Sequence, residues 1–319
     1  MRWCRRAFPR GERLSLSVVD TLGIDIGGTK IAVARVSGEG QVLTSVSAPT
    51  PAGDPAALLQ TVADLVANLT APDVAPTVGV ACAAFMNETR DRVYLAPNIA
   101  WKDYPLLAEL EAVLERPVVI ENDANAAGVA EFEHGAGRGA RSMVMLTIGT
   151  GVGGAVISEG ILLTGGFGVG AELGHVIVEP NGRLCGCGSQ GCLEQYASGT
   201  ALVREAAQLL GRPVEPDELR ELLVSGDPQA REALESVARH IGRALVTLVA
   251  VLDPDVIVLG GGVSDAGAAL IAPLHEEFAR YYGPYSERPV PRIVTASMGN
   301  TAGVVGAATL ARLTQGEAS

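Results

Sequence analysis

Two stretches of the chain repeat one pattern of apolar and polar positions. In each, an apolar run leads into a glycine-rich turn and an alternating run follows, over residues 21–36 and 144–158. Alternation with a period of two is typical of strands, so each stretch predicts a strand–turn–strand hairpin. Residues 255–267 begin in the same way but lead toward a helix. The repetition indicates two related halves, each beginning with a hairpin.

Helical patterns occupy the stretches between and after these hairpins. Apolar positions three and four residues apart, behind capping residues such as Asp54 and Asp227, predict helices. We expect them over residues 54–69, the second part of 116–132, 227–254 and 301–313. Strands that alternate with helices define the α/β class. No low-complexity linker separates the halves, so we expect two closely packed domains around a cleft.

The same patterns set the expected domain boundaries. Residues 18–122 together with 301–319 are expected to form a small N-terminal α/β domain. Residues 123–300 are expected to form a larger C-terminal α/β domain. Residues 1–17 are rich in arginine but lack the apolar stretch of a signal peptide, and we expect either a disordered tail there or an artefact of the chosen start codon.

Charge and composition narrow the class of partner. The 319-residue chain has a formal net charge of −12, and such a surface repels nucleic acid and anionic lipid. No apolar run approaches the length of a membrane span. We therefore expect neither a nucleic acid nor a membrane partner. We expect a cytoplasmic protein in a reducing compartment, where clustered cysteines are more often metal ligands or redox thiols than disulfides.

The glycine-rich turns are candidates for binding phosphate. The turn that follows Asp25 is neither a P-loop nor a dinucleotide fingerprint, because a strand follows it and the lysine spacing does not match. Its backbone N–H groups could still approach phosphate oxygens, and the Asp25 carboxylate could hold a hydrated metal ion. The alternative is an ordinary hairpin with glycine at positive φ. The second turn, together with Gly260, Gly261 and Gly262, favours nucleotide binding.

A carboxylate follows a predicted buried strand. Glu121, Asn122 and Asp123 lie where this strand ends and a helix begins, which is where α/β folds place their sites. The alternative is helix capping, which Asn and Asp often perform. If a hydroxyl attacks phosphorus, a carboxylate must orient it and accept its proton. Asp123 is the best candidate for this general base.

Three of the five cysteines lie within eight positions. The spacing His175-x9-Cys185-x-Cys187-x4-Cys192 provides one imidazole and three thiolates, a complete tetrahedral shell for structural Zn²⁺. Redox chemistry and three unliganded thiols are the alternatives, but the cluster contains no C-x-x-C pair. A bound metal would fix a polar loop and, with it, Glu172, His175 and Glu194. These side chains suit a polyhydroxylated substrate, because they offer acceptors to several hydroxyl donors.

The motifs together resemble a known family. "DIGGTK", "ENDANAA", "TIGTGVGG", "AELGH", "CGCGSQGCLEQYASG" and "LGGGVS" occur in this order. They are similar to the ROK family of sugar kinases and repressors, and within it to glucokinases of actinobacterial type, over about residues 20 to 313. The resemblance implies the actin-like, hexokinase-type ATPase fold. It also implies phosphorylation of the 6-hydroxyl of glucose by ATP with Mg²⁺.

The resemblance also implies roles for individual residues. Asp123 is the expected base, and His175 is expected to give one ring nitrogen to zinc and the other to the sugar. The remaining expected sugar ligands are Asn98, Asn122, Asp123, Glu172 and Glu194. The expected nucleotide contacts are Asp25, Gly27, Gly28, Thr29, Lys30, Gly149, Thr150, Gly151, Gly260, Gly261 and Gly262.

The chain departs from the family pattern near the expected sugar. Ala84 and Asn87 stand in "ACAAFMNETR", where family members usually show a glycine and an aspartate. Mannose, N-acetylated amino sugars and fructose therefore stay open as alternative substrates, and polyphosphate as an alternative donor. A sugar-sensing repressor is disfavoured, because too few residues precede "DIGGTK" for a helix-turn-helix. The family tends to form homodimers and homotetramers.

Overall fold

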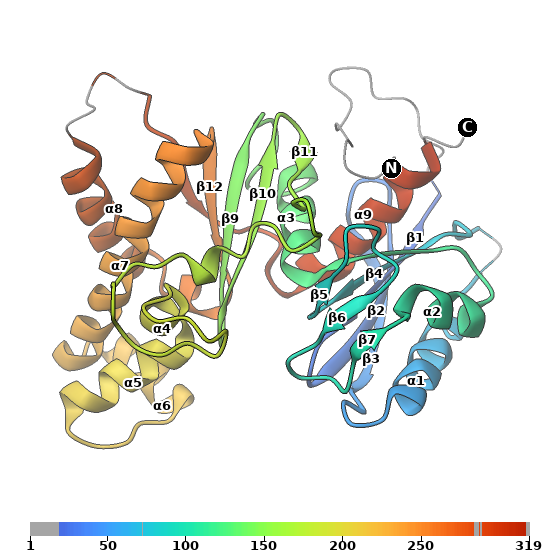
Figure 1. Cartoon of the computed structure of the whole chain (residues 1–319), viewed down its shortest axis with the longest axis horizontal. Coiled ribbons are helices and arrows are strands. Elements are labelled where there is room, and N and C mark those ends of the chain that lie inside the picture. The colour runs from blue at the N-terminus through green and yellow to red at the C-terminus, as the bar shows by residue number, and fades with distance from the viewer. Residues whose placement is uncertain (1–18, 72, 284–286, 288, 317–319) are drawn as a thin grey trace. The chain divides into compact units, whose positions relative to one another are not determined.

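A computed structural model of the chain describes residues 19–71, 73–283, 287 and 289–316 (Figure 1). The predicted tail, residues 1–17, lies outside the described residues. The chain forms two compact units. Unit 1 comprises residues 1–141, 155–171 and 297–319, and unit 2 comprises residues 142–154 and 172–296. Unit 1 extends past the boundary expected at residue 122 because helix α3 (Asp123–Glu133) packs against helix α9 (Ala302–Gly316).

The first sheet begins with the predicted hairpin. β1 and β2 pair antiparallel, and β1, β4 and β8 run parallel to one another. The strand order is β3-β2-β1-β4-β8. The strands are β1 (Thr21–Ile26), β2 (Lys30–Val36), β3 (Val42–Pro49), β4 (Val78–Cys82) and β8 (Val118–Asn122). All five residues of β4 are buried, as expected of a central parallel strand.

Glycines allow helix α9 to approach this sheet closely. A Cβ on Gly23 would lie 1.9 Å from the Val304 carbonyl oxygen, and one on Gly79 would lie 1.8 Å from that of Ala307. A side chain at either position would therefore collide with the backbone of α9. Figure 1 shows α9 beside β1 and β4, and the first sheet depends on this helix to cover one face.

The other face of unit 1 carries two further helices and a small sheet. Helices α1 (Pro55–Ala67) and α2 (Leu106–Leu114) pack against each other. Asp54 caps α1, as predicted, by accepting hydrogen bonds from the N–H groups of Ala56 and Ala57. The small sheet contains β5 (Phe85–Met86), β6 (Val93–Leu95) and β7 (Lys102–Tyr104).

The second five-stranded sheet has the same layout as the first. Its order is β11-β10-β9-β12-β13, and β9, β12 and β13 run parallel. The strands are β9 (Met143–Ile148), β10 (Val152–Ser158), β11 (Ile161–Leu162), β12 (Val256–Gly260) and β13 (Arg292–Thr295). A hairpin followed by a parallel strand on its inner side occurs in both sheets. The predicted duplication of topology is therefore confirmed.

The helices of unit 2 pack around one long helix. Helix α7 (Pro228–Leu252) contacts α4, α5, α6 and α8, and Asp227 caps it as predicted. Its predicted apolar face is buried, including Leu234, Ile241 and Leu245. The neighbouring helices are α4 (Glu194–Ala197), α5 (Gly199–Leu210), α6 (Pro216–Ser225) and α8 (Ala268–Tyr282). Short 3₁₀ turns cover Leu173–His175, Gly262–Ala266 and Gly299–Thr301.

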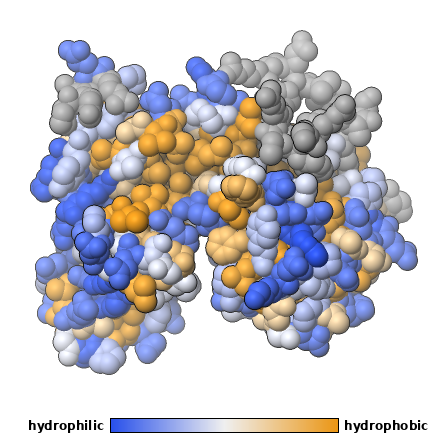
Figure 2. All heavy atoms as spheres, viewed as in Figure 1, coloured by the Kyte–Doolittle hydropathy of each residue, from blue (hydrophilic) through white to orange (hydrophobic). Residues whose placement is uncertain are grey.

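The surface mixes polar and apolar residues. On the face shown in Figure 2, hydrophilic residues are interspersed with hydrophobic ones. No helix among the described residues has the length and apolar character that crossing a lipid bilayer requires.

Candidate functional site

The register of the first sheet gathers polar groups at one edge. Asp25 of β1 pairs with Ala81 of β4, which in turn pairs with Glu121 of β8. In the next row Ile26, Cys82 and Asn122 are aligned in the same way. Because the three strands are parallel, the glycine turn after β1 and Asp123 after β8 both leave the sheet at its carboxyl edge. Ligands of open α/β sheets bind at this edge.

Two carboxylates interact at this edge. The pKa of Asp25 is raised to about 6, mainly by burial and also by the negative charge of Asp123. The positive charge of Lys30 lowers this pKa and offsets part of the rise. Burial also raises the pKa of the Asp123 carboxyl. A cation that bound beside these carboxylates would relieve their mutual repulsion. A carboxylate with a raised pKa is also a better proton acceptor at neutral pH.

The first glycine turn is held by backbone contacts and by a close approach. The Gly27 N–H donates to the Lys30 carbonyl at 3.0 Å, and Thr50 Oγ1 donates to the Gly27 carbonyl at 2.7 Å. A Cβ on Gly28 would lie 2.7 Å from the Cβ of Asn98, so the predicted sugar ligand Asn98 is packed against this turn. Neither glycine has φ in the left-handed region. The sequence therefore requires glycine here for space, not for a hairpin with positive φ.

Asn122 performs the capping role that the sequence left open. Its Oδ1 accepts hydrogen bonds from the N–H groups of Ala124 and Asn125 at 2.9 and 3.1 Å, and its Nδ2 donates to the Ala84 carbonyl at 3.4 Å. Asp123 is the first residue of α3. The cap thus fixes the helix turn that carries the candidate base, and Ala84, one of the departures from the family pattern, is part of its support.

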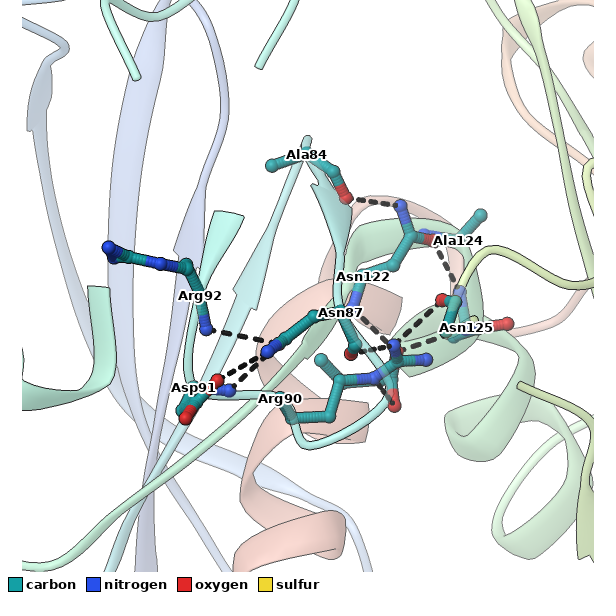
Figure 3. A network of polar contacts seen from close by, with 10 residues as sticks. Ala84, Asn87, Arg90, Asp91, Arg92, Asn122, Ala124 and Asn125 are labelled. Atoms are coloured by element: carbon teal, nitrogen blue, oxygen red, sulfur yellow. Dashed lines mark hydrogen bonds and ion pairs between the residues drawn. The ribbon is translucent and has the colours of Figure 1, made fainter. Parts of the chain in front are cut away.

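A buried ion pair supports this cap. Nε of Arg90 donates to Oε2 of Glu121 at 2.9 Å, and both side chains are at most 7% exposed. Figure 3 shows Arg90 close to Asn122 and Asn125 within the same network of polar contacts. Oε1 of Glu121 accepts the Asn122 N–H at 2.8 Å and Nδ2 of Asn125 at 3.0 Å. Nη1 of Arg90 donates to the carbonyls of Asn87 and Gly168 at 2.9 and 2.7 Å. One guanidinium therefore joins three segments of unit 1.

Asn87, the second departure from the family pattern, organises the turn that presents Arg90. Its Oδ1 accepts the N–H groups of Asp91 and Arg92 at 3.2 and 3.1 Å. Its Nδ2 donates to Thr89 Oγ1 at 2.8 Å and to the Asp91 carboxylate at 2.5 Å. These are bonds of an amide, which supplies both an acceptor and a donor. An aspartate at this position would face the Asp91 carboxylate.

The second glycine turn is fixed from unit 2. Gly199 N–H donates to the Gly149 carbonyl at 2.7 Å, and Thr200 Oγ1 donates to the Thr150 carbonyl at 2.8 Å. The Val152 N–H donates to Oε2 of Glu194 at 3.0 Å, and a Cβ on Gly151 would lie 2.4 Å from this oxygen. The predicted sugar ligand Glu194 thus contacts the predicted phosphate turn.

The third glycine run follows β12. Gly261 has φ of 84°, and a Cβ there would lie 2.5 Å from the Ile148 carbonyl oxygen. Gly260 ends the buried strand, and Gly262 begins a 3₁₀ turn. Since Ile148 is the residue before Gly149, the structure brings this run to the base of the second turn.

The four predicted metal ligands come together in unit 2. The ligand atoms of His175, Cys185, Cys187 and Cys192 all lie within 4.8 Å of one another. Nδ1 of His175 is 3.7 Å from Cys185 Sγ, and the Sγ atoms of Cys187 and Cys192 are also 3.7 Å apart. Ligands about 2.3 Å from a tetrahedral Zn²⁺ would be separated by about 3.8 Å, so the arrangement fits this ion.

The electrostatics of the cluster also favour a cation. Burial and the neighbouring Cys187 and Cys185 thiols raise the pKa of Cys192 to about 12. Several thiolates therefore cannot ionise side by side at neutral pH without a positive charge between them. The loop that holds them needs left-handed backbone at Gly188 and Gly191, with φ of 91° and 81°. A Cβ on Gly191 would also lie 1.9 Å from the Glu179 carbonyl oxygen.

The predicted substrate residues of unit 2 lie within the cluster or next to it in the sequence. His175 directs Nδ1 toward the thiols, which leaves its other ring nitrogen for a second partner. Glu172 precedes the 3₁₀ turn, and its carbonyl accepts the His175 N–H at 3.0 Å. Oε1 of Glu194 lies 3.9 Å from Cys185 Sγ. The two oxygens of Glu194 therefore contact both the cysteine-rich loop and the second glycine turn.

The predicted residues thus form two groups, one in each unit. Unit 1 brings together Asp25, Asp123, Asn122 and the Gly28–Asn98 contact; unit 2 brings together Glu194, the metal ligands and the second turn. Sequence reasoning missed Arg90, the last residue of "ACAAFMNETR", to which it gave no role. It noted Glu121 without a role, although a charged residue inside an apolar strand run was an available signal.

Two hairpin-initiated sheets of equal strand order, with acidic groups at the edge of the first, define a member of the actin-like, hexokinase-type ATPase fold. The ROK family model matches residues 21–314, and the chain belongs to this family.

Individual relatives agree with this assignment. The chain is 41% identical to a glucokinase of Streptomyces coelicolor, over 92% of this chain and 97% of the relative. It is 35% identical to an N-acetylmannosamine kinase of Escherichia fergusonii, over 92% and 98%. Among solved structures, a ROK family glucokinase of Streptomyces griseus in complex with glucose and AMPPNP matches with a TM-score of 0.82 and 40% identity, over 92% of this chain and 99% of that one.

Proposed function

We propose that this protein is a glucokinase that transfers the γ-phosphoryl group of ATP to the 6-hydroxyl of glucose. The observation that carries the proposal is the 41% identity to a glucokinase over almost the whole of both chains. The paired carboxylates at the edge of the first sheet support it, because phosphoryl transfer to a hydroxyl needs a proton acceptor and charge neutralisation.

Asp123 is proposed as the general base. Its position at the start of α3 is fixed by the Asn122 cap, and burial raises the pKa of its carboxyl. The carboxylate would orient the sugar hydroxyl and accept its proton as the new P–O bond forms and the bond from the γ-phosphorus to the bridging oxygen of ADP breaks. General-base assistance is typically worth about 10²–10⁴-fold in rate.

The nucleotide contacts are proposed at the glycine turns. Backbone N–H groups of Gly27 to Lys30 and of Gly149 to Gly151 would donate to phosphate oxygens, and Gly260 to Gly262 would lie on the adenosine side. Asp25 would hold Mg²⁺, which neutralises phosphate charge when bound. The raised pKa of Asp25 supports this role, because a buried carboxylate beside a second one is stabilised by a cation.

The sugar contacts are proposed on both groups of residues. Asn98, Asn122 and Asp123 would contribute from unit 1, and Glu172, His175 and Glu194 from unit 2. His175, Cys185, Cys187 and Cys192 would hold a structural Zn²⁺, which supplies rigidity to the loop and no chemistry. The contact of Glu194 with the second glycine turn would place sugar and phosphate contacts on one connected segment.

A coupled ADP-release assay across a panel of sugars tests the proposal. Glucose, mannose, fructose and N-acetylmannosamine are compared, each with ATP and with polyphosphate. We expect the highest kcat/KM for glucose with ATP. The N-acetylmannosamine arm is included because one relative of that activity is 35% identical. A higher kcat/KM for any other sugar or donor would replace glucose or ATP in the proposal.

A further inference from the structure

The buried ion pair of Arg90 and Glu121, next to the candidate base, is not an arrangement that maximises stability. Arg90 and Glu121 are 6% and 7% exposed, so both charges are removed from water. Replacing a buried ion pair by apolar side chains of similar size is often neutral or stabilising, whereas removing one partner is strongly destabilising. Nη2 of Arg90 is, among the described residues, a buried donor without a hydrogen-bond partner. The pair therefore gives up some stability.

The backbone conformation of Arg90 is also unfavourable for stability. Its φ of 57° lies in the left-handed region, which is unfavourable for residues other than glycine. The Arg90 N–H donates to the Asn87 carbonyl at 3.2 Å and closes the turn in this conformation. The strained turn directs the guanidinium at Glu121, 31 positions further along the chain.

The contacts of the pair converge on the start of α3. Glu121 has one oxygen on Arg90 and the other on the Asn122 N–H and the Asn125 amide. Asn122 and Asn125 lie on either side of Asp123 in the first turn of the helix. Nη1 of Arg90 also donates to the Gly168 carbonyl and so holds the segment that leads to Glu172. The guanidinium has a rigid fork of donors that can keep these groups in one relative position.

We propose that Arg90 and Glu121 are positioning residues that fix the first turn of α3 so that Asp123 can act on the substrate hydroxyl. This inference rests on the proposed function in naming Asp123 as the base. The positioning itself is a statement about the structure of unit 1. A misplacement of about 1 Å in a catalytic group can cost about 10²-fold in rate.

Replacing the ion pair by two apolar side chains separates a loss of positioning from a loss of stability. Arg90→Met combined with Glu121→Met removes both charges and leaves no unpaired one. We expect this double variant to unfold at a higher temperature than Arg90→Met alone, because the buried unpaired carboxylate is gone. We nevertheless expect its kcat to remain about 10²-fold below wild type, with the KM for ATP little changed.

A matched control is available in the same unit. Arg312 is 9% exposed and donates to the carbonyls of Gly38 and Ser37 at 2.8 and 3.0 Å, in the turn after β2. Arg312→Met removes a buried guanidinium of the same kind from a different place. We expect it to lower the melting temperature and to leave kcat near the wild-type value.

Amide hydrogen exchange gives a readout that does not depend on activity. In the double variant, we expect exchange at Asn122, Ala124 and Asn125 to accelerate by at least about tenfold, with no such change in Arg312→Met. If stability, kcat and exchange all return together to wild-type values in the double variant, the positioning role is wrong. If the wild type phosphorylates no sugar while the exchange result holds, the proposed function fails and the positioning of this turn stands.

Discussion

The two glycine hairpins begin sheets of the same strand order but are surrounded by different chemistry. In the first, Asp25 lies just before the turn and interacts with Asp123. In the second, the corresponding residue before the turn is Thr147, and the carboxylate that contacts the turn is Glu194, about 40 residues further along the chain. In the first half, Asp25 lies on a strand of the sheet and Asp123 begins the helix that follows another strand, whereas in the second half Glu194 begins the short helix that follows the cysteine-rich loop.

This difference shows that a duplicated backbone can carry different side-chain chemistry in its two halves. Backbone geometry is repeated, because both turns leave the carboxyl end of a buried strand. The acids are not repeated, which agrees with the proposed function, because that function would need one base and one cation ligand. In the first half the support of these acids is an ion pair, and in the second we propose a metal ion. Four sets of substitutions test this contrast.

The largest effect is expected at the base. Asp123→Ala removes the proton acceptor, and we expect kcat to fall by about 10²–10⁴-fold while the protein stays folded. Steady-state kinetics and circular dichroism measure both. Asp64→Ala, which removes an exposed carboxylate from α1, is the control and is expected to change neither. Activity within about tenfold of wild type would refute the role of Asp123.

The metal ligands are the next test. Cys187→Ser removes one ligand of the cluster, and we expect one zinc per chain in the wild type and almost none in the variant. Loss of one ligand is expected to weaken metal binding by more than about 100-fold, the upper range for outer-shell partners. Elemental analysis of protein purified without chelators measures this, with Cys82→Ser as the control. Wild-type protein without stoichiometric metal would overturn the cluster as a zinc site.

The pH dependence of stability distinguishes Asp25 from its counterpart. Because the folded-state pKa is raised from 3.8 to about 6, the folded protein binds this proton more tightly than the unfolded chain does. Its ionisation therefore destabilises the fold progressively between about pH 4 and pH 6, by about 3 kcal/mol in total.

Asp25→Asn removes this cost. We expect the variant to be more stable than wild type by up to about 3 kcal/mol at pH 8 and equally stable below about pH 4. Urea unfolding at both values measures the difference. Thr147→Val in the second hairpin has no charge to remove and is expected to show no such pH dependence. A stability difference independent of pH would show that Asp25 ionises normally.

The smallest effect is expected when a glycine in one of the turns is replaced by alanine. A Cβ on Gly151 would lie 2.4 Å from Glu194 Oε2, whereas one on Gly149 would meet nothing within 4 Å. We expect Gly151→Ala to lower the free energy of unfolding by about 1–3 kcal/mol and Gly149→Ala to have almost no effect. In the first turn, Gly28→Ala is expected to act like Gly151→Ala because of Asn98. Equal tolerance at Gly149 and Gly151 would contradict the contact with Glu194.

Local sequence signals predicted much of the fold. The caps at Asp54 and Asp227, the apolar face of α7 and both hairpins were readable because each depends on residues close together in the chain. The sequence also predicted that His175 and the three cysteines would come together, because their spacing is specific; metal binding there stays a prediction. The domain boundary was harder to predict, since it depends on the packing of α3 against α9, a helix near the other end of the sequence.

The contacts that hold the candidate site in place could not be predicted from the sequence, because most of them join residues far apart in the chain. Asn122 could be predicted as a cap or as a ligand, and only its bonds to Ala124 and Asn125 distinguish the cap. Arg90 lies 31 residues from Glu121 and 78 from Gly168, so no local pattern connects them. Likewise, no spacing rule predicts that Glu194 accepts the Val152 N–H.

The close packing of α9 has a consequence for synthesis. Gly23 and Gly79 leave room for the backbone of a helix that begins at Ala302, so the first sheet waits for residues that are translated after the whole of unit 2. While the nascent chain is on the ribosome, β1 and β4 expose an apolar face without its cover. We therefore expect the half of the protein that is translated first to complete its packing only after α9 has been translated, later than unit 2.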